Sequence, residues 1–244
     1  MNAIRVLVNG AKGRMGQEAV KAITEESGLE LMAQTDLDDN LPAVLRGSGA
    51  QVAVDFTTAA VAYDNARTII ESGVRPVIGT SGLLPEQVAE LQALCQEKQI
   101  GGVIAPNFAI GAVLMMKYAT DAAKYLPHVE VIELHHDRKA DAPSGTAVKT
   151  ANLIAEARTE TPAPLDEREL VSGARGGKIQ GIPVHSIRLP GLVAHQEVIF
   201  GGKSETLTIR HDSIHRESFM PGVCLSCKKA VGLDKLVYGL EHIL

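Results

Sequence analysis

The 244-residue sequence predicts an α/β fold: a doubly wound parallel sheet, followed by a second, smaller α+β domain built on an open mixed sheet. Short β-rich runs alternate with longer helical stretches through the first half of the chain. Runs such as 52–54 are apolar on both faces, which is typical of parallel strands covered by helices on each side. Beyond residue 107 longer extended runs and a glycine-containing turn indicate antiparallel pairing.

Each element of the first half follows from its residue pattern. Short runs rich in valine and isoleucine predict strands, and the amphipathic stretches between them predict helices. In chain order we expect a strand at Ile4–Val8, a helix at Arg14–Glu26, strands at Leu29–Ala33 and Val52–Asp55, a helix at Ala59–Ser72, a strand at Pro76–Ile78, a helix at Glu86–Lys98 and a strand at Gly102–Ala105.

The second half is expected to begin with a helix near Gly111–Lys124, a strand near Val129–His135 and a helix that starts near Ser144. Val193–Phe200 and Glu205–His211 predict a hairpin in which glycine supplies the positive φ of the turn. The apolar helix at Val223–Gly232 is expected to return to the first domain. We therefore predict one domain from residues 1–106 and 217–244, and another from residues 107–216.

Composition excludes several classes of protein. Hydrophobic residues make up 45% of the chain, enough for a buried core, and 24 basic and 29 acidic residues are well mixed, so no nucleic-acid partner is expected. Cys95, Cys224 and Cys227 are too few for a disulfide framework or a four-ligand zinc site, which favours a reducing cytoplasm. The pattern around the last two favours core packing over thiol chemistry. No segment approaches 18 apolar residues, so neither a membrane span nor a signal segment is expected.

A glycine-rich turn carries the first functional signal. Gly10–Gly16 follows the first strand and opens the first helix, so its backbone N–H groups and the helix dipole could hold a pyrophosphate. Asp36, at the end of the next strand, could accept both ribose hydroxyls of an adenosine. Although the spacing is G-x-x-G-x-x-G, this context predicts a Rossmann-like dinucleotide site; the alternative is a plain tight turn with a surface aspartate.

The choice of dinucleotide depends on charge. Asp36 would repel a 2′-phosphate, whereas Lys12 and Arg14 could attract one, and Leu37 follows the acid where an arginine clamp would stand. We therefore expect the protein to use both NADH and NADPH, with NADH at least as good.

Two more loops follow strands of the predicted sheet, Gly79–Gly82 and Ala105–Phe108. Ligands of open α/β sheets lie beyond the carboxyl ends of the strands, so these loops should flank the ribose and nicotinamide. Asp55 could also approach the cofactor, with a surface ion pair as the alternative.

The stretch from Glu133 to Thr146 combines His135, His136, Arg138 and Lys139 with a predicted helix start at Ser144. The N–H groups around residues 145 and 146 form a neutral anion cradle. We predict a small dicarboxylate substrate, with one carboxylate in the cradle and the other held by His136 and Lys139, while a remaining cation donates a proton. No histidine spacing nominates a metal site, so none is expected.

At this point the sequence resembles the 4-hydroxy-tetrahydrodipicolinate reductase family, also called dihydrodipicolinate reductase, of bacterial lysine and diaminopimelate biosynthesis. The resemblance covers nearly the whole chain. It rests on GAKGRMG at Gly10–Gly16, VDFT at Val54–Thr57, GTSG at Gly79–Gly82, APNF at Ala105–Phe108, ELHHDRKADAPSGTA at Glu133–Ala147, RLPG at Arg188–Gly191, His195, and His211-Asp212-Ser213 followed by Arg216.

The resemblance implies a reductase that uses NADH and/or NADPH, with residues 1–106 and 217–244 binding the dinucleotide. Residues 107–216 would bind substrate and form a homotetramer through a surface at the hairpin Val193–His211. The implied proton donors are His135 and Lys139, and the implied substrate contacts are His136, Ser144, Gly145 and Thr146. The implied cofactor contacts are Gly10, Ala11, Lys12, Gly13, Arg14, Met15, Asp36, Gly79, Thr80, Ser81, Ala105, Pro106, Asn107 and Phe108.

Residue chemistry leaves some alternatives open. His135 can donate a proton near neutral pH, and Lys139 can do so if neighbouring cations lower its pKa, so the sequence does not rank them. Another NAD(P)-dependent dehydrogenase on the same scaffold would keep the glycine turn but would not need the basic loop. A non-catalytic nucleotide sensor would need neither His135 nor Lys139.

Overall fold

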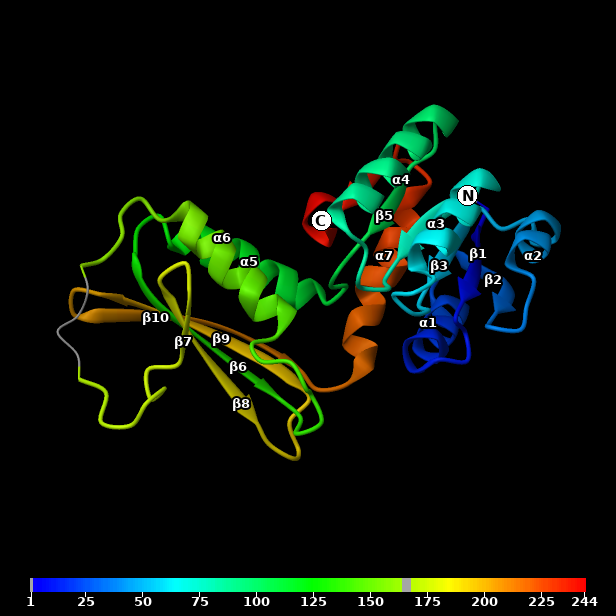
Figure 1. Cartoon of the computed structure of the whole chain (residues 1–244). Helices are drawn as coiled ribbons and strands as arrows, with labels where there is room; N and C mark the ends of the chain where they lie inside the picture. Colours follow the sequence, from blue (N-terminus) through cyan, green and yellow to red (C-terminus); the bar gives the residue numbers. More distant parts are fainter. Residues whose placement is uncertain (1, 164–167) are drawn as a thin grey trace. The chain divides into compact units, whose positions relative to one another are not determined.

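The structure is a computed structural model that describes residues 2–163 and 168–244 (Figure 1). The chain forms two compact units. One comprises Met1–Ile110 and Arg216–Leu244, and the other comprises Gly111–His215. The C-terminal segment therefore returns to the unit in which the chain begins.

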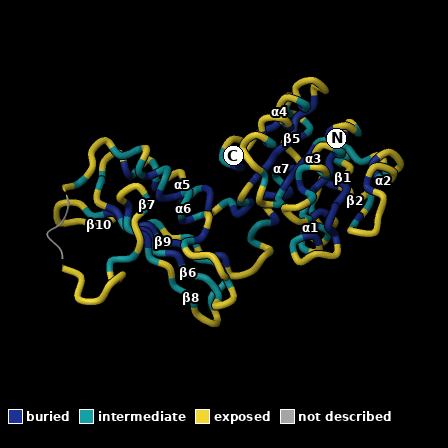
Figure 2. Tube along the Cα trace, viewed as in Figure 1, coloured by how far each residue is buried: buried dark blue, intermediate teal, exposed yellow. Residues whose placement is uncertain are grey.

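The first unit contains a parallel sheet of six strands in the order β11-β5-β4-β3-β1-β2. This topology confirms the predicted doubly wound parallel sheet. Figure 2 shows the central strands as mostly buried, because helices lie on both faces, whereas the edge strand β2 is largely half-buried or exposed. The strands are β1 (Ile4–Asn9), β2 (Leu29–Thr35), β3 (Val52–Asp55), β4 (Arg75–Ile78), β5 (Gly102–Ile104) and β11 (Leu236–Tyr238).

Alternate residues of these strands face opposite helical layers. Leu7, Ala53 and Ile78 belong to a hydrophobic cluster with the buried sides of α2 (Leu41–Ser48), α3 (Ala62–Glu71) and α4 (Pro85–Lys98). The helices α1 (Arg14–Glu25) and α7 (Met220–Ala230) pack against each other, and α7 also contacts the sheet. Apolar strands of this kind are stable only when both faces are covered.

The sequence pattern missed one α-helix and one strand of this unit. The helix α2 is short, and its signals are an N-cap and a proline: the Asn40 side chain accepts a hydrogen bond from Ala43 N at 3.0 Å, and Pro42 occupies the first turn. The strand β11 is only three residues long and becomes a strand by pairing with β5. Local propensity does not determine such a strand, because its partner lies far away in the sequence.

The helix α7 contains Cys224 and Cys227, which are both buried free thiols. Burial raises the pKa of Cys224 to about 11 and raises the pKa of Cys227 further. A thiol that stays protonated is a poor nucleophile, so core packing, the expected role, is confirmed.

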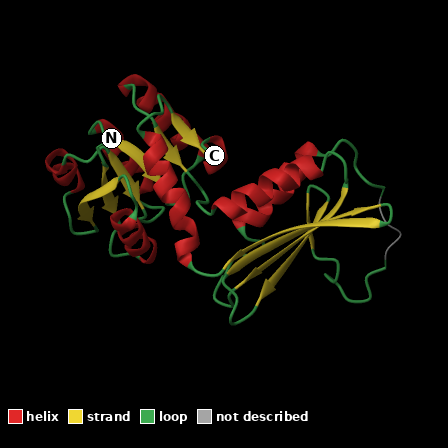
Figure 3. Cartoon of the chain, turned by 180° about the vertical axis from the view of Figure 1, so that it is seen from behind, coloured by secondary structure: helices red, strands yellow, loops and turns green. Residues whose placement is uncertain are grey.

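The second unit contains a mixed five-stranded sheet in the order β10-β9-β6-β8-β7. Figures 1 and 3 show α5 and α6 side by side over one face of this sheet. The elements are α5 (Ile110–Ala122), β6 (His128–His135), α6 (Gly145–Ala157), β7 (Gly177–Ile179), β8 (Ile182–Arg188), β9 (Ala194–Gly202) and β10 (Glu205–Ser213). The sequence pattern indicated no strands at β7 and β8.

The hairpin of β9 and β10 is confirmed, but the prediction for its turn is wrong in one respect. Gly202 pairs with Glu205, so the loop consists of Lys203 and Ser204. The positive φ, 66°, belongs to Ser204, whereas the two glycines lie within β9. Serine adopts this conformation at a modest energetic cost, and the long antiparallel ladder on either side imposes it.

Candidate active site and dinucleotide cradle

The predicted cofactor loops all lie in the first unit, directly after the carboxyl ends of neighbouring parallel strands. The glycine turn follows β1, Asp36 follows β2, residues 79–81 follow β4 and residues 105–108 follow β5. The structure therefore brings together at one sheet edge four segments that are far apart in the sequence. This edge is where open α/β sheets bind their ligands.

The glycine turn is packed so tightly that side chains cannot replace Gly10 or Gly16. Gly10 has φ +77°, and a Cβ atom there would lie 2.4 Å from the Phe56 carbonyl oxygen. A Cβ on Gly16 would lie 2.0 Å from the carbonyl oxygen of Gly10. The helix α1 begins after Gly13, and no side chain of the described residues caps it. Its first N–H groups and its dipole are therefore suited to a phosphate group, as the dinucleotide hypothesis requires.

The Asp36 carboxylate is oriented by backbone donors. It accepts hydrogen bonds from Leu37 N at 2.9 Å and from Lys12 N at 2.7 Å. These two bonds, the one from Leu37 first, lower the pKa of Asp36. The ionised acid is thus attached to the glycine turn itself, and a 2′-phosphate placed beside it would meet a negative charge.

A chain of buried hydrogen bonds runs across the same edge. Thr35 Oγ1 at the end of β2 donates to Asn9 Oδ1 on β1 at 2.8 Å, and Asn9 Nδ2 donates to Asp55 Oδ2 on β3 at 2.8 Å. Thr80 Oγ1, after β4, donates to Asp55 Oδ1 at 2.7 Å. Asp55 has no exposed surface, so the alternative of a surface ion pair is wrong. Its carboxylate instead fixes the positions at which the predicted cofactor loops after β1 and β4 begin, relative to the end of β3.

The loops after β3, β4 and β5 meet around two aromatic rings. Phe56 and Phe108 are in edge-to-face contact, with ring centroids 5.9 Å apart. A Cβ on Gly79 would lie 2.1 Å from the Phe56 ring, so only glycine lets this loop pass the ring. The loops predicted to flank the nicotinamide therefore share one packed base.

The predicted substrate residues lie together in the second unit. The strand β6 ends at His135, the basic loop follows, and Ser144 caps α6 by accepting a hydrogen bond from Ala147 N at 3.2 Å. The predicted helix start is thus confirmed. Gly145 is exposed and Thr146 half-buried at the amino end of this helix, where backbone N–H groups suit a carboxylate.

A buried carboxylate that the sequence did not single out lies beneath this loop. Glu133 has no exposed surface and forms a two-pronged ion pair with Arg188, at 2.7 and 2.9 Å. It also accepts from Ser144 N at 3.2 Å, and its Oε2 lies 2.5 Å from Nδ1 of His135. Burial alone would raise the pKa of Glu133, but hydrogen bonds from Arg188, Ser186 and His135 outweigh it and lower the pKa. Glu133 is therefore ionised at neutral pH.

The environment of His135 favours the neutral ring. Burial is the largest effect and lowers its pKa, and the charges of Lys139 and Arg188 act in the same direction. The Glu133 carboxylate opposes them by raising the pKa, but the net shift is downward. A dianionic ligand beside the ring would favour the imidazolium, so ligand binding and proton uptake should be coupled.

The cations of the loop are held differently. Lys139 Nζ donates to both carboxylate oxygens of Asp141, at 2.8 and 2.9 Å, on the protein surface. His136 Nδ1 is buried and has no hydrogen-bond partner among the described residues. An orphaned buried ring nitrogen is expensive unless a ligand or water satisfies it, so His136 fits a ligand contact.

Two further polar residues named by the resemblance form a separate group in the second unit. His195 Nδ1 lies 2.7 Å from Asp212 Oδ1, and its Nε2 accepts a hydrogen bond from Val193 N at 3.1 Å. Arg210 also pairs with Asp212, at 3.0 Å. Both nitrogens of His195 are thus already used within the unit.

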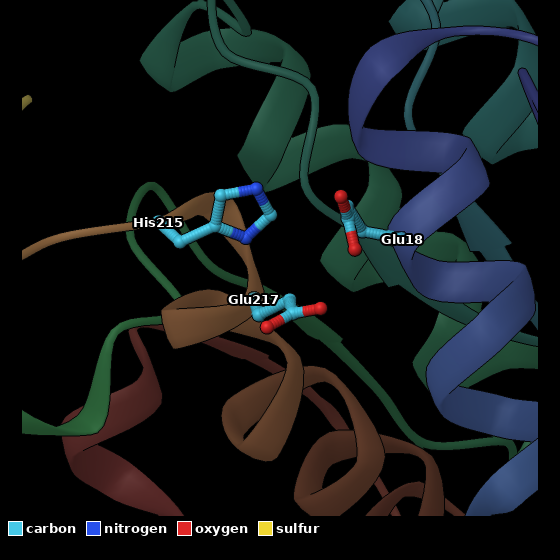
Figure 4. A group of neighbouring side chains, drawn as sticks. All are labelled: Glu18, His215 and Glu217. Atoms are coloured by element: carbon cyan, nitrogen blue, oxygen red, sulfur yellow. The ribbon is translucent and has the colours of Figure 1, made fainter.

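No metal is assigned to the group formed by Glu18, His215 and Glu217. Figure 4 shows Glu18 on α1 and Glu217 on the short 3-10 helix Arg216–Phe219, which His215 precedes. Glu217 pairs with Lys21 at 2.8 Å, and both side chains are more than half exposed. Exposed acidic groups of this kind are ordinary surface ion pairs.

Within the described ranges, no helix is both long enough and apolar enough to cross a lipid bilayer.

Comparison with known proteins covers both units. The family model for the N-terminal part of dihydrodipicolinate reductase matches residues 4–108, and the model for its C-terminal part matches residues 111–244. A 4-hydroxy-tetrahydrodipicolinate reductase of Streptococcus gordonii is 54% identical over 99% of both chains. A protein of the same name from Listeria monocytogenes is 52% identical over 99% of this chain and 100% of its own.

Solved structures give the same result. A dihydrodipicolinate reductase from Paenisporosarcina sp. TG-14, with dipicolinate bound, superposes with a TM-score of 0.92 at 42% identity and covers 99% of this chain and 100% of its own. GenD2 of gentamicin biosynthesis, in complex with NAD, has a TM-score of 0.66 at 14% identity and covers 100% of this chain and 90% of its own. The second likeness concerns the fold alone.

Proposed function

This chain belongs to the dihydrodipicolinate reductase family. We propose that its first unit binds the dinucleotide and its second unit binds the substrate. The reaction is the NAD(P)H-dependent reduction of 4-hydroxy-tetrahydrodipicolinate to tetrahydrodipicolinate, with loss of water, in lysine and diaminopimelate biosynthesis. The dinucleotide-binding domain corresponds to residues 1–106 and 217–244. The domain for substrate binding and oligomerisation corresponds to residues 107–216.

The observation that carries this proposal is the cluster of cations and backbone donors between His135 and Thr146. His136, Ser144, Gly145 and Thr146 hold the carboxylates of the substrate. Support comes from the unsatisfied Nδ1 of His136 and from the exposed amino end of α6. The dipicolinate bound to the Paenisporosarcina enzyme is a ligand of this chemical class.

The proton donors are His135 and Lys139. When bound, the reduced nicotinamide supplies the hydride to a ring carbon conjugated to an imine, and negative charge then develops toward the ring nitrogen. His135 or Lys139 neutralises this charge by giving a proton. Since His135 is held near the neutral state in the ligand-free unit, the dianionic substrate itself must favour its protonation.

The cofactor contacts come from the four loops at the sheet edge. They are Gly10, Ala11, Lys12, Gly13, Arg14, Met15, Asp36, Gly79, Thr80, Ser81, Ala105, Pro106, Asn107 and Phe108. Both NADH and NADPH serve, with NADH at least as good, because the Asp36 carboxylate disfavours a 2′-phosphate. A hundredfold preference for NADPH in steady-state kinetics would contradict this assignment.

The experiment for the proton donors compares His135→Ala and Lys139→Ala with the parent chain. Loss of nicotinamide absorbance is followed with NADH and the substrate imine. Each variant should lower kcat by about 100-fold or more, while the dissociation constant for NADH stays nearly unchanged. Full turnover in both variants would remove the acid assignment.

A homotetramer formed at the hairpin Val193–His211 is the proposed assembly. Its support is that β10 is an edge strand of the sheet and that Leu207 on it is 40% exposed. Sedimentation analysis tests it, and a monomer at micromolar concentration would contradict it. A cytoplasmic location is proposed from the three free thiols, and cell fractionation tests it.

A further inference from the structure

Glu133 occupies a position that normally belongs to an apolar side chain. Along β6 it shares one face with Val129 and Val131, and all three are buried. An ionised carboxylate in such a place is expensive unless charged partners and hydrogen-bond donors compensate for the lost water. Two of the groups that compensate it, His135 and Ser144, belong to the proposed substrate site.

Besides the hydrogen bond from Ser186, this carboxylate has partners on both of its oxygens. Oε2 accepts a hydrogen bond from Nη1 of Arg188 at 2.9 Å and lies 2.5 Å from Nδ1 of His135. Oε1 accepts hydrogen bonds from Nη2 of Arg188 at 2.7 Å and from the backbone N–H of Ser144 at 3.2 Å. Arginine only donates hydrogen bonds, and the ionised Glu133 carboxylate only accepts them. Nδ1 of His135 must therefore carry the proton in its bond to Oε2. Nε2 is then the ring nitrogen left for chemistry.

We propose that Glu133 is a positioning residue of the reductase: charge-balanced by Arg188, it holds Nδ1–H of His135 so that Nε2 is the atom that gives up the proton. This inference rests on the proposed function and deepens it. In the step, Nε2–H of the imidazolium breaks and its proton bonds to the substrate, which has accepted the hydride and its electron pair. His135 is left neutral with its proton on Nδ1, and solvent later restores the proton on Nε2.

The same carboxylate connects the proton donor to the anion cradle. Its bond to Ser144 N fixes the residue that caps α6, and Arg188 Nη2 also donates to the carbonyl oxygen of Asp141 at 2.7 Å. The pair from β6 and β8 therefore holds Asp141 and Ser144 in the later part of the basic loop, and Glu133 also holds His135 at its start. A shift of Glu133 would therefore displace both the proposed proton donor, His135, and the anion cradle at the amino end of α6. A shift of a side chain with only a packing role would not move the two together.

The charged groups that face His135 come from three elements. Glu133 lies on its own strand, Arg188 on β8 and Lys139 on the basic loop. Of these only Glu133 favours the imidazolium. Replacing Glu133 by a neutral side chain should therefore lower the pKa of His135 further and release the constraint on its tautomer.

The chain contains a matched control on the same strand. Glu130 Oε1 pairs with Arg175 Nη2 at 2.5 Å, and its Oε2 lies 2.8 Å from Nε2 of His185. This trio has the same three residue types as Glu133, Arg188 and His135. Because side chains alternate along a strand and Glu130 is an odd number of positions from Glu133 on β6, it points to the opposite face of the sheet. Loss of its charge should leave kcat near that of the parent.

The experiment measures the full-length chain as Glu133→Gln, Glu130→Gln and the double variant Glu133→Gln/Arg188→Met. The double variant removes both buried charges, and so keeps the test valid if Glu133→Gln alone fails to fold. Circular dichroism checks folding, and ¹⁵N chemical shifts of the imidazole rings report the tautomer and pKa of His135. Steady-state kinetics separate kcat from the KM for NADH.

In the parent chain we expect neutral His135 to carry its proton on Nδ1. In Glu133→Gln and the double variant this tautomer should be lost, the pKa should fall, and kcat should fall by about 100-fold or more, with little change in the KM for NADH. An unchanged tautomer, or a kcat loss as large in Glu130→Gln, would overturn the inference. Full turnover in His135→Gln would overturn it as well. Failure of the proposed function is seen separately, as the absence of NADH oxidation when the parent chain is mixed with the substrate imine.

Discussion

The hydrogen-bond chain at the carboxyl edge of the first sheet makes Asp55 the position to perturb. Asp55→Ala removes the buried acceptor that Asn9 Nδ2 reaches at 2.8 Å and Thr80 Oγ1 at 2.7 Å. Thr57 Oγ1 and Asn65 Nδ2 also donate to Asp55, at 2.8 and 3.0 Å. The threonine hydroxyls can rotate to another acceptor, and Asn65 Nδ2 keeps Thr57 Oγ1 at 3.1 Å, whereas the buried Asn9 amide has no such alternative. Orphaning one buried donor costs about 1–3 kcal/mol.

The space left by the carboxyl group adds to this cost. Deleting buried atoms destabilises a protein by a further ~1 kcal/mol when the site does not collapse. Relief from burying a carboxylate acts in the opposite direction, so we expect a net loss of about 2–3 kcal/mol. For a chain of this length each kcal/mol lowers Tm by roughly 2–4 °C, which gives a decrease of about 4–12 °C.

The second consequence concerns the cofactor. Asp55 connects the ends of β1, β3 and β4, from which the glycine turn and the loop at residues 79–81 depart. When these loops lose their register, the dissociation constant for NADH should rise about tenfold, as expected for a loss of ~1.4 kcal/mol in binding. Substrate affinity measured with a dicarboxylate analogue should change little.

Circular dichroism follows unfolding, and nicotinamide fluorescence follows NADH binding without interference because the chain has no tryptophan. Asp234→Ala is the matched control, since this aspartate of the same unit is exposed. If Asp55→Ala unfolds at the same temperature as Asp234→Ala and binds NADH equally well, the argument that the buried chain sets the register of the loops is wrong.

Three other predictions concern single features. Gly16→Ala should raise the KM for NADH by about tenfold or more, because its Cβ would lie 2.0 Å from the Gly10 carbonyl oxygen; unchanged kinetics would show that the turn does not bind the dinucleotide. Asp36→Ser should shift preference toward NADPH, and the ratio of kcat/KM values for the two dinucleotides checks it. The pKa of His135 and of His211 is lowered in the folded chain, chiefly by burial, so the stability they contribute is present above about pH 6.5 and is lost as pH falls through their folded values. Thermal unfolding at pH 8 and pH 5 should show this loss, and a His135→Gln/His211→Gln variant should show less of it.

Some of the site could be predicted without a structure because its signals are local. The glycine turn, the acid after the next strand and the cap at Ser144 each depend on a few neighbouring residues whose geometry follows from strand-turn-helix connections. The hairpin was predicted for the same reason. Its turn was not, because the ladder of β9 and β10 rather than glycine propensity determines which residue takes positive φ.

The sequence by itself determined the α/β architecture, the loops proposed to bind the cofactor and the basic loop, since periodicity and contiguous motifs encode them. Only the tertiary structure decided what Glu133 and Asp55 do. Arg188 is 55 residues from Glu133, and Asn9 is 46 residues from Asp55, so nothing in either local pattern indicates a partner. A buried carboxylate is tolerated only where the fold brings donors to it, and which donors arrive is a property of strand order.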